Sequence, residues 1–280
     1  MDTVAIAGVG LIGGSFALAI REAGFRGTIL GVSSPATIET AMRMGVIDEG
    51  VTLQKAAERA DLIYLAQPIL SIIDALTEIG DRARPETLIT DAGSTKAQIM
   101  SAARDRVSRA LFIGGHPMAG KETRGVAAAD ASLFRGRPYV LTPRRRSDLD
   151  EPAAAQFREW LERIGAQLVV LDAEEHDRRT ALVSHVPQLL STALASLLSE
   201  RDDATEVAGP AVIELTRLAM SPWDVWRDII VTNGRHINDA LEQLIAKLND
   251  YQAKLSTADL EPEFRAAGAL ASRLRKQAGT

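Results

Sequence analysis

The chain has 280 residues, of which 46% are hydrophobic, so it can bury a large core and is expected to form two domains. It contains no cysteine and only four histidines, which excludes disulfides, thiolate metal sites and a cysteine nucleophile and argues against a metal centre. The net charge of −5 gives no reason to expect nucleic acid or a membrane surface as partner. Because the chain has no run of about 20 apolar residues and no room for a signal peptide before Val4, we expect a cytoplasmic protein.

The most informative stretch lies at the start of the chain, where an apolar strand from Val4 runs into a glycine turn and then a helix over residues 15–23. Three glycines in this turn have the spacing GxGxxG. In a dinucleotide-binding turn, the first glycine permits the sharp bend, the second lets the backbone approach the pyrophosphate, and the third lets helix and strand pack closely. The alternative is a tight turn that binds nothing. We expect dinucleotide contacts from Gly8, Gly10, Leu11, Ile12 and Gly13.

A second strand is expected over residues 28–32 and a helix over 36–44, which completes a βαβ unit. In folds of this kind that bind NAD, an Asp or Glu about 20 residues beyond the glycines accepts from the ribose 2′-hydroxyl. Ser33 and Ser34 occupy that place here. Because no carboxylate would repel a 2′-phosphate and two hydroxyls can donate to it, NADP is favoured as the cofactor, with NAD as the alternative.

Five further apolar runs alternate mostly with helical segments, which predicts an α/β domain over residues 1–172 with a mostly parallel sheet buried on both faces. Ligands bind at the carboxyl ends of such strands. We therefore expect one cleft to collect the segments that follow three of these strands: residues 66–68 (Ala66, Gln67 and Pro68), 91–96 and 114–122. The predicted strands cover residues 62–66, 87–90, 110–113, 139–142 and 167–171.

From residue 173 to 280 the pattern predicts helices only. Residues 173–198 read as one long helix kinked at Pro187, and Ser221 with Pro222 reads as the N-cap and first residue of another. Over residues 240–255 apolar side chains recur at helical spacing. That stripe is either core within the domain or the seam of a homodimer, and the seam is favoured.

Several motifs, in this order along residues 4–229, resemble the prephenate/arogenate dehydrogenases of tyrosine biosynthesis: GVGLIGGS, DAGSTK, GGHPMAGKE, RGRPYVLTP, HDRRTALVSHVP, ELTR and SPWDVWRDI. The resemblance implies a Rossmann-type domain followed by an all-helical dimerisation domain. It also implies the oxidative decarboxylation of a cyclohexadienyl acid by NAD(P)+, with a small-molecule substrate and no metal. Two alternatives stay open, namely another Rossmann and helical dehydrogenase of the 3-hydroxyacid or 6-phosphogluconate type and a non-catalytic NADP-sensing protein.

The resemblance also assigns roles. His116 matches the histidine that hydrogen-bonds the ring 4-hydroxyl, and Ser94 matches the serine that contacts the same hydroxyl and orients this histidine; the alternatives are a structural histidine and a helix N-cap. Arg217 matches the arginine that binds the ring carboxylate, with an ordinary surface ion pair as the alternative. Ser184 and His185 match cleft residues, and His176 is expected to be an orienting or an interdomain residue rather than a catalyst.

Departures from the family pattern bear on the choice of substrate. Gln188 stands where many members have histidine, and its neutral amide oxygen can accept from the ammonium of arogenate, so arogenate is favoured over prephenate. Lys121 stands where serine or threonine is common, and it is counted with Glu122 among the substrate-binding residues. Asp91 and Lys96 are expected near the cofactor. The alternatives are that Lys96 simply pairs with Asp91 and that Asp91 fixes the loop at the end of its strand.

Overall fold

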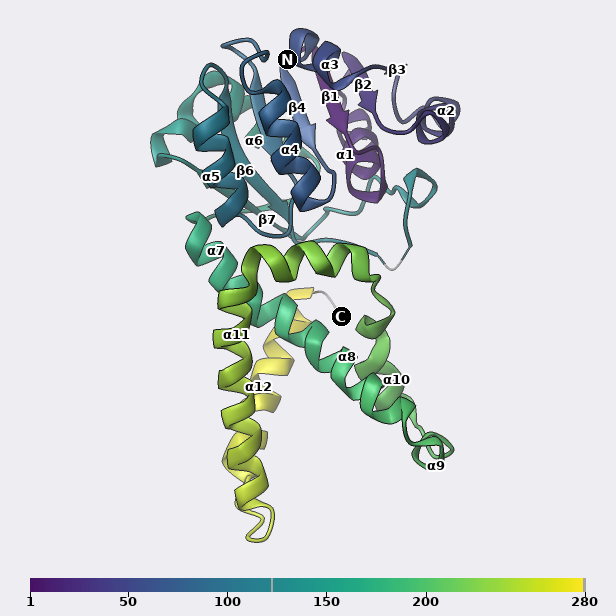
Figure 1. Cartoon of the computed structure of the whole chain (residues 1–280), viewed down its shortest axis with the longest axis vertical. Coiled ribbons are helices and arrows are strands. Elements are labelled where there is room, and N and C mark those ends of the chain that lie inside the picture. Colours follow the sequence, from purple (N-terminus) through teal and green to yellow (C-terminus); the bar gives the residue numbers. More distant parts are fainter. Residues whose placement is uncertain (122, 279–280) are drawn as a thin grey trace.

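An eight-stranded sheet forms the N-terminal part of the molecule (Figure 1). The computed structural model describes residues 1–121 and 123–278. The strand order is β3-β2-β1-β4-β5-β6-β7-β8, and neighbours are parallel except β6 and β7, so the mostly parallel α/β sheet expected from the sequence is confirmed. The strands are β1 (Thr3–Ala7), β2 (Thr28–Val32), β3 (Glu49–Gly50), β4 (Leu62–Leu65), β5 (Leu88–Asp91), β6 (Leu111–Pro117), β7 (Pro138–Pro143) and β8 (Gln167–Val170).

Helices cover both faces of the sheet, because its strands present apolar side chains on both sides. On β1, for example, Ile6 packs with Phe16 of α1 on one face, while the adjacent Ala5 belongs to the core on the other face with Leu76 of α4. The second core continues into the C-terminal helices through Ile229, so the two parts of the chain share apolar packing. The helices of this part are α1 (Leu11–Glu22), α2 (Pro35–Arg43), α3 (Leu53–Arg59), α4 (Ile69–Ile79), α5 (Ala97–Arg106) and α6 (Pro152–Arg163).

Two features of the sheet domain differ from the sequence prediction. Helix α1 begins at Leu11, four residues before the expected start, because the glycines that read as turn residues are already helical from Gly13. Strand β3 was not predicted, since its two residues are too few to show any alternation of polar and apolar side chains.

From Ala173 onward the described chain is helical, as predicted. The expected long helix over 173–198 is three pieces: α7 (Ala173–Thr180), a π-helical turn (Ala181–His185) and α8 (Val186–Ser199). Pro187 lies inside the continuous helical segment Ala173–Ser199, where it has no N–H to bond to the preceding turn, so the irregularity falls directly before the proline. π-Helical turns of this kind are frequent at functional sites.

Helix α11 (Trp223–Lys254) connects the two parts of the molecule and is bent at Asn233, whose φ and ψ are −131° and 19°. Figure 1 shows one arm of α11 running beneath the sheet domain and the other running away from it. Pro222, not Ser221, is the N-cap, and no side chain caps this end, so the predicted cap was wrong. The remaining helices are α9 (Asp202–Thr205), α10 (Pro210–Thr216), a 3₁₀ turn (Arg217–Met220) and α12 (Glu261–Ala278).

Apolar side chains remain exposed on these helices in a single chain. Ile245 and Leu248 on the second arm of α11 are each 48% exposed, and the adjoining Leu255 is 67% exposed. Within the described residues, one helical segment, Ala173–Ser199, is long and apolar enough by length and composition to cross a membrane, and only 28% of its most apolar window is buried. In the stripe predicted over 240–255, Leu241 and Leu244 pack against the core of their own chain, whereas Ile245, Leu248 and Leu255 are exposed. This exposed part of the stripe favours the dimer seam.

Candidate active site

The glycine turn between β1 and α1 has the geometry that its spacing predicts. Gly8 has a φ of +92°, and a Cβ at this position would lie 2.5 Å from the carbonyl oxygen of Ala66. At Gly13 a Cβ would lie 2.2 Å from the Gly8 carbonyl oxygen, so only glycine lets α1 pack this closely on the turn. Gly10, in contrast, would meet no atom within 4 Å. Its backbone therefore faces open space at the N-terminus of α1, where a phosphate can approach.

A groove of about 550 Å³ runs from this turn past the end of β2. Ser33 and Ser34 line it and are exposed, and the Ser34 hydroxyl also lies 2.9 Å from that of Thr37, at the start of α2. The lining contains no carboxylate among the described residues, in keeping with the missing acidic residue noted in the sequence. The other predicted cofactor residues on this groove are Gly8, Gly10, Ala66, Gln67 and Pro68.

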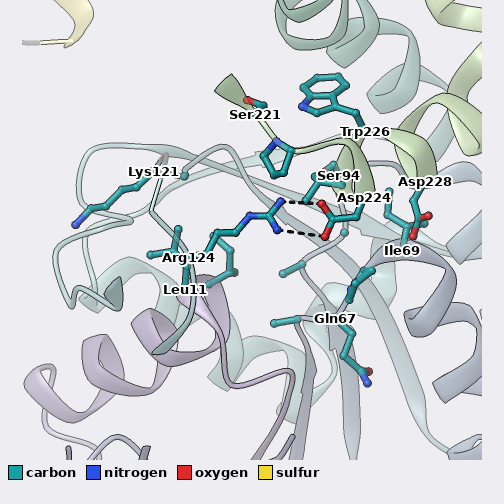
Figure 2. Close-up of a pocket in the computed structure, with 18 of the residues that line it drawn as sticks. Leu11, Gln67, Ile69, Ser94, Lys121, Arg124, Ser221, Asp224, Trp226 and Asp228 are labelled. Carbon is teal, nitrogen blue, oxygen red and sulfur yellow. Dashed lines mark hydrogen bonds and ion pairs between the residues drawn. The ribbon is translucent and has the colours of Figure 1, made fainter. Parts of the chain in front are cut away.

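A second cavity, of about 430 Å³, adjoins the groove and shares Ala66, Gln67 and Pro68 with it (Figure 2). Its walls come from the ends of β4 and β5, the loop after β6, and the first turns of α11. Its volume lies within the range of small-molecule sites. Four more predicted residues line this pocket, namely Leu11, Ile12, Ser94 and Lys121, so the structure brings together the strand-end segments that were expected to share a cleft.

His116 lies near the end of β6, directly before the loop that lines the pocket, and it is 8% exposed. Its Nδ1 lies 2.8 Å from Nε2 of His176 on α7, whose Nδ1 lies 2.7 Å from Oδ1 of Asp177. The Asp177 carboxylate also accepts from the backbone N–H groups of Lys96 and Ala97, so it caps the N-terminus of α5. His176 is therefore an orienting residue, one of the two roles expected for it. The structure gives no hydrogen bond between Ser94 and His116, so this orientation does not come from the serine.

This chain of hydrogen bonds determines which nitrogen of His116 bears a proton. The carboxylate of Asp177 can only accept, so Nδ1 of His176 carries hydrogen. Burial lowers the pKa of His176, so the ring is neutral at neutral pH and its Nε2 accepts from Nδ1–H of His116. Burial, with the positive charge of Lys96 after it, also holds the pKa of His116 well below its ordinary value. The lone pair of the neutral His116 ring is consequently on Nε2, the form that a proton acceptor requires.

Asp91 and Lys96 are both fully buried and paired with each other. Asp91 also accepts from the N–H groups of Gly93 and Gly115, at 2.8 and 3.1 Å. Burial lowers the pKa of the Lys96 ammonium, and the charge of Asp91 opposes this. Neither side chain lines the groove or the pocket, so the expectation of direct cofactor contacts is corrected. The alternative, an ion pair that fixes the loop after β5, is what the structure shows.

Family models for two domains of one kind of enzyme match the chain. The nucleotide-binding domain of prephenate dehydrogenase matches residues 16–170, and the prephenate dehydrogenase dimerization domain matches residues 172–267. The chain belongs to the prephenate dehydrogenase family. It is thus an NAD(P)-dependent oxidoreductase of tyrosine biosynthesis, and this assignment replaces the 3-hydroxyacid and 6-phosphogluconate alternatives.

Relatives in this family include enzymes named for either substrate. The chain is 35% identical over 266 residues to the prephenate dehydrogenase of Lactococcus lactis subsp. cremoris, covering 92% of this chain and 73% of that protein. The A. aeolicus prephenate dehydrogenase, solved with hydroxyphenyl propionate and NAD+, has a TM-score of 0.88 and 28% identity, covering 99% of this chain and 98% of that one. Synechocystis arogenate dehydrogenase has a TM-score of 0.81 and 27% identity, covering 98% and 99%.

Two family-derived residues lie away from the pocket within one chain. Gln188 is buried on α8, and its Nε2 donates to the carbonyl oxygen of Leu218 at 2.7 Å, so the structure does not present its amide to a substrate. Arg217 lines a separate apolar cavity of about 600 Å³ between α8, α10 and α11. Glu122, expected to bind substrate, lies outside the described residues.

The π-helical turn before α8 places two predicted residues next to the pocket wall. His185 is buried, its ring packs edge-on against Trp226 with centroids 5.8 Å apart, and Trp226 lines the pocket. Nδ1 of His185 lies 3.3 Å from Nδ2 of Asn233, at the bend of α11. Burial lowers the pKa of His185 to about 4, so it is a neutral supporting residue. The neighbouring Ser184 is half-buried and, like His185, is not part of the lining.

One pair in the pocket was missed by sequence reasoning. Arg124, in the loop after β6, makes a bidentate ion pair with Asp224 in the first turn of α11, at 2.8 and 3.2 Å. Figure 2 shows these two side chains meeting within the pocket, while Lys121 points away from them. Lys121 pairs with Asp130. The partners are 100 positions apart in the sequence, and only their charges and the SPWDVWRDI motif could have suggested them.

Proposed function

We propose that this dehydrogenase oxidatively decarboxylates a cyclohexadienyl acid, arogenate and/or prephenate, and forms L-tyrosine or 4-hydroxyphenylpyruvate, with NADP+ favoured over NAD+. The observation that carries the proposal is the junction of the glycine-turn groove with a small pocket at Ala66, Gln67 and Pro68. A hydride acceptor in the groove would thus adjoin a substrate in the pocket. Ser94 lines the pocket, and the oriented, neutral His116, although not itself in the lining, lies three residues before Ala119, which is.

The residues of the groove suit a nicotinamide dinucleotide. Gly10 leaves room for a pyrophosphate at the N-terminus of α1, and the hydroxyls of Ser33 and Ser34 can donate to a 2′-phosphate. When bound, NAD(P)+ supplies the hydride acceptor. The absence of a carboxylate in the described lining is what favours NADP+ over NAD+.

His116 acts on the 4-hydroxyl of the ring. Its Nε2 lone pair accepts a hydrogen bond from the hydroxyl and takes up positive charge as the hydride leaves C4. The C1 carboxylate then departs as carbon dioxide, its C–C bonding pair completes the aromatic ring, and the proton remains on or returns to the phenol oxygen. Ser94 contributes a second hydrogen bond to that oxygen. His176 and Asp177 keep His116 in the required tautomer throughout.

A homodimer is part of the proposal. The exposed stripe on α11 and the match to a dimerization domain both support a seam formed by the helical part of the chain. The family role of Arg217 is to hold the ring carboxylate, and this role also bears on whether the enzyme is a dimer. Because Arg217 lines a different cavity within one chain, that role requires a second copy to bring it to the pocket.

The test is reduction of cofactor, followed at the nicotinamide absorbance, with arogenate and prephenate each offered beside NAD+ and NADP+. We expect turnover with at least one pair, and His116→Asn should lower kcat by about 10²-fold or more without changing cofactor affinity. His236→Asn is the matched control, since His236 pairs with Glu174 away from the pocket. No reduction with either acid would refute the proposed function.

A further inference from the structure

The Arg124–Asp224 pair has properties that a purely structural ion pair does not need. Its side chains are 51% and 66% exposed and line the same pocket as Ser94. Exposed ion pairs contribute little to stability because solvent screens them and both side chains lose freedom. The pair nevertheless holds one positive and one negative group side by side within the pocket. Arg124 comes from the sheet domain and Asp224 from the helical part.

Both partners keep hydrogen-bonding capacity toward a ligand. A guanidinium has five N–H donors, and Asp224 engages Nη1 and Nη2 of Arg124 with one bond each. A carboxylate has about four acceptor positions; Arg124 occupies one on each oxygen of Asp224 and the backbone N–H of Val225 takes another, which leaves room for a ligand. The Arg124 hydrogen bond, opposed by slight desolvation, lowers the pKa of Asp224, so it is negatively charged at neutral pH. A ligand can therefore join the pair without breaking it.

The other charged groups of the pocket point away from the Arg124–Asp224 pair or are buried. Lys121 pairs with Asp130 at 2.7 Å and points away from the pair (Figure 2). Asp228 is buried and pairs with Arg227 at 2.9 Å. Among the described lining residues, Arg124 and Asp224 are thus the charges placed to receive a charged group of a ligand.

We propose that this pair binds the α-amino acid group of the substrate, with Arg124 holding the carboxylate and Asp224 the ammonium, and that it selects arogenate over prephenate. The inference rests on the proposed function and names the substrate within it. An α-amino acid carries both charges on one carbon, so it matches a cation and an anion held together. A keto acid offers the same carboxylate to Arg124 but turns a carbonyl oxygen toward Asp224, where two acceptors meet without a hydrogen between them.

The test compares kcat/KM for arogenate and prephenate in the dimeric enzyme and its variants. Asp224→Asn should lower kcat/KM for arogenate by about tenfold or more while that for prephenate stays the same or rises. Arg124→Gln should lower both by about tenfold, because both substrates carry the side-chain carboxylate. Glu49→Gln is the matched control, since Glu49 makes a bidentate ion pair with Arg59 outside the pocket; it should change neither value.

Binding provides a readout independent of turnover. Calorimetry on the NADP+-loaded enzyme should show that Asp224→Asn weakens L-tyrosine binding about tenfold and leaves 3-(4-hydroxyphenyl)propionate, which has no ammonium, unchanged. An equal loss for both substrates in Asp224→Asn would identify a latch between the domains and overturn the inference, as would no change. If the unaltered enzyme reduces cofactor with neither acid, the proposed function itself has failed.

Discussion

Replacing His176 with leucine tests whether the buried chain of hydrogen bonds sets the state of His116. The variant removes the acceptor that lies 2.8 Å from His116 Nδ1 and the donor that lies 2.7 Å from Asp177. A buried N–H left without a partner costs about 1–3 kcal/mol. The His116 ring can avoid this cost by adopting the other tautomer or by turning, and the tautomer with its lone pair on Nε2 then becomes the minor state. The expected fall in kcat is then about 10- to 100-fold.

The same variant should shift the pH profile in a defined direction. His116 is active as the neutral ring, so kcat/KM is lost as the pH falls through its pKa. Burial lowers that pKa in the native enzyme, which predicts an acid limb well below pH 6.5. The neutral His176 accepts from Nδ1–H of His116, and this hydrogen bond is stronger when His116 is protonated, so its loss should lower the pKa of His116 further and move the acid limb to lower pH.

The assay is a pH series of kcat and kcat/KM with saturating cofactor, together with the cofactor dissociation constant and the thermal midpoint. His236→Leu serves as the control, because it removes a histidine bonded to Glu174 outside the pocket. An unchanged kcat and an unmoved acid limb in folded His176→Leu would refute the assigned tautomer. If cofactor affinity fell by the same factor as kcat, the proposal that His176 acts only through His116 would be refuted.

Four other outcomes are expected. Lys96→Met should lower the free energy of unfolding in urea by about 3–5 kcal/mol, because it leaves Asp91 charged and unpaired in the interior, and adding Asp91→Asn should restore part of it; an unaffected single variant would contradict this. Ser33→Asp should raise the KM for NADP+ and lower that for NAD+, and equal changes in both would argue against a 2′-phosphate site there. Gly10→Ala should retain the thermal midpoint, since its Cβ meets no atom within 4 Å, yet weaken cofactor binding in a titration. Leu248→Asp should give a monomer by light scattering, whereas a persisting dimer would place the seam elsewhere.

The sheet domain could be predicted from the sequence because its signals are local. Apolar runs such as residues 62–66 mark buried strands, and the glycine spacing marks the turn after β1. The irregularity before α8 was also indicated locally, by Pro187, although its π-helical form was not. The bend of α11 at Asn233 could not be predicted in this way, because it depends on contacts between segments, for example the Asn233 amide that donates to the carbonyl oxygen of Asp177 at 2.8 Å.

The same distinction applies to the site. Ser94 and His116 were found through motifs, and His176 was expected to be an orienting or an interdomain residue, but which neighbour it orients is decided by a contact 60 positions away. The burial of a polar side chain was harder to predict from the sequence than its role. Gln188 reads as a polar residue beside a proline, and only the packing of α8 against the turn containing Leu218 shows that its amide is already engaged.

The bend at Asn233 divides α11 into a short arm and a long arm, so a small rotation at the bend becomes a large displacement at the far end. One arm carries Trp226 and Asp228 into the pocket wall, and the other, residues 234–254, extends for about 30 Å at 1.5 Å per residue. A rotation of about 5° at the bend would move the far tip by about 3 Å, a distance comparable to the rise of two helical residues. A second chain that held this tip would therefore also limit rotation at the bend. Subunit association would then calibrate the width of the pocket, and dilution to monomers should loosen substrate binding before the fold is lost.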